Sequence, residues 1–86
     1  RYGGEEFCCL LPETPLAAAT VLAERFRKKI AEQVFVYQKD QVSLTISLGV
    51  SAMSLETTTA EALLRKADDG LYTAKNRGRN QIEVVP

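Results

Sequence analysis

Two adjacent glycines near the start of the chain, Gly3 and Gly4, constrain the fold more than any other feature. Glycine adopts positive φ without steric cost, so the pair permits a tight reversal of the backbone. The apolar run from Phe7 to Leu11 follows almost at once and predicts a strand that is covered on both faces. Glu5 and Glu6 would then lie at a hairpin tip, as either a solvated acidic turn or a place for a metal ion.

The composition is typical of an ordinary globular domain. The 86 residues are 45% hydrophobic and 26% charged, and 11 basic residues balance 11 acidic ones. We therefore expect one domain at most, and no net charge that would favour nucleic acid or a membrane surface. No apolar stretch has membrane-spanning length. The absence of histidine excludes His-based acid–base catalysis and most zinc sites within this segment.

Cys8 and Cys9 are neighbours within the predicted first strand. Successive side chains of a strand point to opposite faces, which is a poor geometry for a mutual disulfide or a shared metal. We expect both to be buried free thiols that pack as small apolar side chains, and Phe7 to lie in the core beside them. The first residue already lies within the glycine motif, and no initiator Met precedes it, so we expect a fragment of a longer protein.

A first helix is predicted from about Pro15 to Gln33, with Thr14 as its N-cap and Pro15 in the first helical position. Its apolar stripe recurs at three- and four-residue spacing and consists of Leu16, Ala19, Leu22, Ala23, Phe26 and Ile30. Four cations toward its end suit the negative end of the helix dipole or form a solvated helix end; they are Arg25, Arg27, Lys28 and Lys29.

A hairpin is predicted next. Val34 to Tyr37 alternates as a short strand, residues 38–41 form a polar turn, and residues 43–51 form the clearest strand in the sequence. One face of that strand carries Leu44, Ile46, Leu48 and Val50. Gly49 interrupts the other face, which indicates either close approach by a backbone or ligand or a packing accommodation.

A second helix is predicted to begin at the capping-box pattern that joins Thr58 to Glu61. Its buried face carries Leu63, Leu64, Ala67, Leu71 and Ala74. It should end near Asn76, with Gly78 as the C-terminal cap. Gly70 in its interior costs about 1 kcal/mol relative to Ala, so tertiary packing must support the helix there. Residues 81–85 alternate as a last strand.

The order is therefore strand, helix, hairpin, helix and strand (β-α-ββ-α-β). It predicts an α+β fold in which both helices pack on one sheet. The end of the second helix carries three cations around Gly78, namely Lys75, Arg77 and Arg79. They form either a cationic C-cap or the cationic half of a binding site.

Two motifs resemble the GGDEF family, the bacterial diguanylate cyclases. Arg1-Tyr2-Gly3-Gly4-Glu5-Glu6-Phe7 resembles the signature turn in its variant with Glu at the third position. Tyr72-Thr73-Ala74-Lys75 followed by Gly78-Arg79-Asn80 resembles the last helix and the turn after it. The strand core Thr45–Val50 and the pair Ala67–Asp68 are also similar. Gly70 departs from the pattern, since Ala is common there, and we expect it to loosen the helix without touching the chemistry.

The resemblance covers residues 1–86 but only the C-terminal portion of the family's domain. It implies a truncated ferredoxin-like, nucleotidyl cyclase-like sheet with two helices packed on it. The first strand, with a metal-binding Asp, and the helices before the signature turn are absent. So are the guanine-recognising residues and the inhibitory Arg-x-x-Asp motif.

The implied activity is condensation of two GTP molecules to cyclic di-GMP and pyrophosphate by a head-to-head homodimer, with Mg²⁺ or Mn²⁺ as cofactor. The resemblance makes Glu5 the catalytic and metal-binding carboxylate, with Glu6 as a weaker metal ligand. Gly3 and Gly4 would let the nucleotide approach the backbone, because they have no side chains. Lys75 and Arg79 would bind its phosphates. Arg25 corresponds to a product-inhibition residue, and Tyr72 is expected to pack.

Three further expectations follow. A nonenzymatic GGDEF module that binds GTP or cyclic di-GMP remains the alternative to an active cyclase, although the intact signature turn counts against it. The 86 residues alone should be inactive, and their unpaired strand edges favour a strand-swapped or edge-paired oligomer. The need for GTP places the domain in the cytoplasm, whether or not the parent protein is anchored to a membrane by other domains.

Overall fold

The computed structural model describes residues 5–86 and has the predicted α+β class. Its elements, in chain order, are helix α1 (Leu16–Glu32), strands β1 (Val34–Tyr37), β2 (Asp40–Ser43) and β3 (Leu48–Val50), helix α2 (Ala60–Asn76) and strand β4 (Ile82–Val84). In the described residues, β1 pairs with β2 in antiparallel fashion and β3 pairs with β4 in parallel. The prediction of a single sheet is therefore wrong, while the fold is consistent with a truncated nucleotidyl cyclase-like domain.

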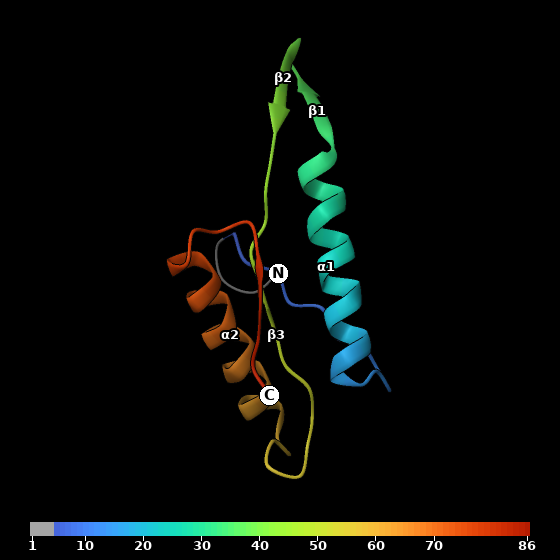
Figure 1. The fold of residues 1–86 in the computed structure, drawn as a ribbon, viewed down its shortest axis with the longest axis vertical. Coiled ribbons are helices and arrows are strands. Elements are labelled where there is room, and N and C mark those ends of the chain that lie inside the picture. The colour runs from blue at the N-terminus through green and yellow to red at the C-terminus, as the bar shows by residue number, and fades with distance from the viewer. Residues whose placement is uncertain (1–4) are drawn as a thin grey trace.

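The β3–β4 pair lies between the two helices (Figure 1). Parallel strands need a crossover connection, and α2 with its flanking loops provides it. Both helices pack on this pair, as predicted, and they do so from opposite sides. Within residues 5–86, neither helix is long and apolar enough to cross a membrane.

Two glycines allow α2 to pack closely on the strands. A Cβ built on Gly49 would lie 1.8 Å from the carbonyl oxygen of Ala67 and 2.4 Å from the amide nitrogen of Leu71. A Cβ built on Gly70 would lie 2.9 Å from the carbonyl oxygen of Glu83 and 3.1 Å from the Cα of Gly49. The close approach at Gly49 is therefore to another backbone, and the same contact gives Gly70 the tertiary support that the helix requires.

The β1–β2 hairpin projects beyond the rest of the molecule (Figure 1). Its turn consists of Gln38 and Lys39, whose φ angles are 49° and 74°, and Tyr37 faces Asp40 across it. Positive φ at both central residues is the geometry that matches the twist of a two-residue hairpin. The long second strand predicted over residues 43–51 is wrong, because β2 ends at Ser43 and residues 44–47 have no regular structure.

The strand predicted from Phe7 to Leu11 does not form. Phe7 is 75% exposed, and Cys8 and Cys9 are exposed free cysteines, so the expected burial of all three is wrong. A strand needs a partner for its backbone groups. Within residues 5–86, β1 and β2 pair with each other, as do β3 and β4, and none of them pairs with this segment.

The helix ends differ from the prediction by about one residue. Pro15 is the N-cap of α1, and the hydroxyl of Thr14 donates instead to the Pro12 carbonyl at 3.0 Å. Thr59, rather than Thr58, caps α2, and its Oγ1 accepts from the Ala62 amide at 3.1 Å. The C-terminal cap is confirmed, because Gly78 has a φ of 116° just after the Arg77 cap.

Candidate functional site

Glu6 and Lys75 meet although 69 positions separate them in the sequence. Lys75 Nζ lies 3.3 Å from Glu6 Oε2, and the two side chains are 36% and 35% exposed, respectively. Lys75 is in the last turn of α2, where a cation also complements the negative end of the helix dipole. The fold thus brings the predicted acidic segment to the predicted cationic helix end.

Glu5 precedes Glu6 and is exposed. Gly3 and Gly4, predicted to admit the nucleotide, lie outside the described residues. Hard divalent cations such as Mg²⁺ prefer oxygen ligands and usually take one or two protein carboxylates. Residues 5–86 contain no group of three or more acidic or cysteine side chains placed around a common point. The metal-binding roles of Glu5 and Glu6 therefore stay predictions, and in this structure Glu6 is paired with Lys75.

Arg79 lies in an unusual turn after α2, formed by residues 77–80 and called here the basic turn. Three successive residues, Gly78, Arg79 and Asn80, have positive φ angles of 116°, 64° and 48°. Left-handed conformations are unfavourable for residues with a Cβ, so surrounding contacts must maintain them. Gln81 supplies two of these contacts, because its Nε2 donates to the carbonyls of Arg77 and Arg79, each at 3.0 Å.

The backbone of the basic turn is also bonded to its neighbours. The Arg79 amide donates to the Ala74 carbonyl at 2.9 Å, which is a 6→1 bond of the kind that closes helices. The Asn80 amide donates to Ser47 Oγ at 3.1 Å, next to the start of β3. No hydrogen bond or ion pair of the Arg79 side chain is found among residues 5–86. The turn is thus held through backbone groups, and Arg79 itself is exposed.

Arg27 contacts the same turn, which the sequence prediction missed. Its Nη1 donates to Asn80 Oδ1 at 2.8 Å and to the Asn80 carbonyl at 3.4 Å, and its Nε bonds to Glu24. The side chain is only 17% exposed, so Arg27 is not part of a solvated helix end. The available signal was spacing: Arg27 falls four residues after Ala23 and three before Ile30, both members of the apolar stripe.

Comparison with known proteins identifies the family. A family model described as "Diguanylate cyclase, GGDEF domain" matches residues 1–81. This chain belongs to the GGDEF family. In an alignment of 84 positions that covers 95% of this chain, it is 46% identical to the response regulator PleD of Caulobacter vibrioides. It is 40% identical over 84 residues, or 98% of its length, to diguanylate cyclase A of Treponema denticola.

A third GGDEF relative, diguanylate cyclase DgcP of Pseudomonas aeruginosa, is 43% identical over 85 residues, or 99% of this chain. The matched regions cover 18% of PleD, 23% of diguanylate cyclase A and 12% of DgcP. The chain thus spans less than a quarter of the length of these relatives.

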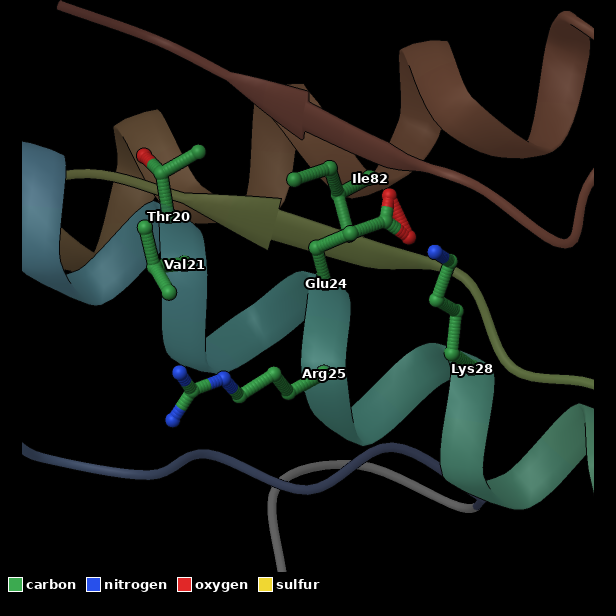
Figure 2. Close-up of a pocket in the computed structure, with 6 residues that line it drawn as sticks. All are labelled: Thr20, Val21, Glu24, Arg25, Lys28 and Ile82. Atoms are coloured by element: carbon green, nitrogen blue, oxygen red, sulfur yellow. The ribbon is translucent and has the colours of Figure 1, made fainter.

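Arg25, the residue that the resemblance linked to product inhibition in this GGDEF chain, lies on α1. It is exposed and borders an open groove between α1 and β4 (Figure 2), lined by Thr20, Val21, Glu24, Arg25, Lys28 and Ile82. Figure 2 shows Glu24 directed toward Ile82, whereas Arg25 extends along the other side of α1. Its role in product inhibition stays a prediction.

Tyr72 lies one helical turn before Lys75 on α2, in the second of the two motifs that resemble the GGDEF family. Its side chain is 71% exposed, so the expectation that it packs in the core is wrong. The buried positions of α2 are instead Gly70 and Ala74, which are small residues. Tyr72 is two residues from each of them, so at 3.6 residues per turn it lies on the opposite side of the helix.

Proposed function

We propose that this chain is part of a diguanylate cyclase, which condenses two GTP molecules into cyclic di-GMP and releases pyrophosphate. The observation that carries the proposal is the contact between Glu6 and Lys75 at 3.3 Å. It places the acidic segment of the signature turn beside a cation at the end of α2. A site for a metal-bound polyphosphate needs both kinds of group in one place.

In this reaction a 3′-hydroxyl of one GTP attacks the α-phosphate of the other. Lys75 binds phosphate oxygens as a point charge, and Arg79 binds them with its donor fork. Glu5, supported by Glu6, holds a divalent cation, Mg²⁺ or Mn²⁺, which when bound neutralises the charge that develops on the phosphate. Gly3 and Gly4 leave room for the nucleotide beside the backbone.

Each GTP is held by one domain, so catalysis requires a homodimer in which two such sites face each other. The 86-residue chain alone should then be inactive, because the rest of the site comes from other parts of the parent protein. Because the reaction needs GTP, we assign the domain to the cytoplasm, where GTP is supplied. Arg25 is proposed to bind cyclic di-GMP at an inhibitory site, which would reduce activity as product accumulates.

The test is cyclic di-GMP production from GTP and Mg²⁺ by the full-length parent. Three further samples are compared with it: the 86-residue chain, Glu5→Gln and Glu56→Gln. Glu56 is an exposed acid in the loop before α2, so its variant controls for loss of a carboxylate. We expect product from the parent and from Glu56→Gln, and none from Glu5→Gln.

Two results would contradict this proposal. Full activity of Glu5→Gln would remove the assigned role of that carboxylate. Binding of GTP or cyclic di-GMP by the parent without turnover would instead support a nonenzymatic regulatory module.

A further inference from the structure

We propose that Arg27 is a positioning residue for the phosphate-binding cation Arg79, acting through Asn80. The inference rests on the proposed function, because it assumes that Arg79 binds the nucleotide. Arg27 lies on α1, whereas the basic turn leads to β4 from α2, which packs on the opposite side of the β3–β4 pair. Arg27 is the side chain that connects the first helix to this turn.

The geometry of the contact suits this role. The guanidinium of Arg27 reaches both the side-chain oxygen of Asn80, at 2.8 Å, and its carbonyl, at 3.4 Å. Glu24, one turn earlier on α1, bonds to Arg27 Nε and limits the movement of the guanidinium. A planar guanidinium held in this way fixes the orientation of the group that accepts its hydrogen bonds, as well as the distance to that group.

The basic turn requires such support. Arg79 and Asn80 both have positive φ, and an arginine in this region gains nothing from its own side chain. Without Arg27, the turn would keep the Gln81 bonds and the Ser47 bond but would lose the contact that joins it to α1. A shift of the backbone at Asn80 moves Arg79 directly, and misplacing a positioning group by about 1 Å can reduce the rate by roughly 100-fold.

The test uses the full-length parent and two readouts. Hydrogen exchange is measured on the peptide that covers residues 76–82, and the KM for GTP and kcat are measured by cyclic di-GMP production. The variants are Arg27→Ala, Arg27→Lys, Arg79→Ala and the double variant Arg27→Ala/Arg79→Ala. Lys29→Ala removes a nearby exposed cation of α1 and serves as the matched control.

We expect Arg27→Ala to speed exchange in the basic turn and to raise the KM for GTP by about tenfold, with a smaller change in kcat. Arg27→Lys should fall between it and the parent, because Lys keeps the charge but loses the fork. In the Arg79→Ala background, Arg27→Ala should have almost no further effect on KM, since both changes then remove the same interaction. Lys29→Ala should change neither readout.

Three results would overturn the inference, and they are distinguishable from one another. Unchanged exchange in Arg27→Ala would show that Arg27 does not hold the turn, whatever the enzyme does. A full additional KM effect in the Arg79→Ala background would show that Arg27 acts by another route. No effect of Arg79→Ala itself on KM or on GTP binding would remove the proposed role of Arg79, and with it the residue to be positioned.

An Asn80→Gly variant provides an independent check. Glycine accepts the positive φ of this position, so the substitution removes the acceptor side chain without new backbone strain. If Arg27 acts through Asn80, this variant should raise the KM in the same direction as Arg27→Ala, and the two effects should not add. Additive effects would overturn the route through Asn80.

Discussion

Lys75 Nζ lies 3.3 Å from Glu6 Oε2, and this ion pair joins the start of the described chain to its last helix. Each side chain is about one-third exposed, so the pair is partly screened by water. Its importance is therefore positional: it sets the acidic segment and the cationic helix end at hydrogen-bonding distance, and in the proposed function a metal-bound polyphosphate would contact both.

Glu6→Gln in the parent should cost less than about 1 kcal/mol of unfolding free energy, because an exposed ion pair contributes little. Cyclic di-GMP production should fall, but by less than in Glu5→Gln, because Glu6 supports the metal site while Glu5 is the principal ligand. Thermal melting and product formation measure the two effects. Glu6→Gln that is as inactive as Glu5→Gln would contradict the division of roles.

Gly49→Ala should be severely destabilising. Its Cβ would lie 1.8 Å from a backbone oxygen of α2, so the helix must move away from β3, at a cost of about 3 kcal/mol or more. Gly70→Ala should be milder, because its nearest contact is 2.9 Å and Ala favours the helix by about 1 kcal/mol. Denaturant unfolding of the two variants compares them directly. Equal stability would show that the close packing of α2 on β3 is not maintained in solution.

Arg79→Gly should separate stability from activity. Glycine relieves the positive φ of 64°, so we expect an unfolding free energy that is unchanged or higher by up to about 1 kcal/mol. Loss of the guanidinium should raise the KM for GTP and lower its turnover, and Arg79→Lys should recover part of the activity. A strongly destabilised Arg79→Gly protein would mean that the side chain also holds the turn.

Thr57→Val should stabilise the protein by about 1 kcal/mol, because an unpaired buried hydroxyl carries a desolvation cost. Thr57 is fully buried, and its Oγ1 has no hydrogen-bond partner among residues 5–86. Valine has a similar shape and no polar atom to leave unpaired. Thr58→Val at the neighbouring exposed position is the control and should shift the melting temperature little. A lower melting temperature for Thr57→Val would indicate a partner for the hydroxyl.

The 86-residue chain should self-associate through strand exchange or edge pairing. Phe7 and Leu10 are 75% and 76% exposed, and β3 and β4 each have one paired neighbour among the described strands. Exposed apolar segments and open strand edges favour pairing with another chain. Light scattering after gel filtration should show oligomers, and Phe7→Ser/Leu10→Ser should reduce them. A monomer at high concentration would contradict this prediction.

Local sequence signals predicted both helices, the first arm of the hairpin and the last strand, because helix periodicity, turn residues and caps act over a few neighbouring positions. Gly78 illustrates this, since a helix end needs a residue that accepts positive φ and the sequence places glycine there. The one-residue differences at Thr14 and Thr58 also have local causes. Adjacent threonines offer alternative caps, and the hydroxyl of Thr14 bonds backward to Pro12.

Sequence alone also singled out the candidate residues Glu5, Glu6, Lys75 and Arg79, through motifs whose spacing identified the family. Tertiary structure decided which of them meet, and it assigned Gly49 to a backbone contact. It also showed that Arg27 bonds to Asn80 in the turn that carries Arg79. Phe7 shows the reason. An apolar run indicates that its side chains can be buried, but their burial and the pairing of the strand depend on which other segments lie beside that run.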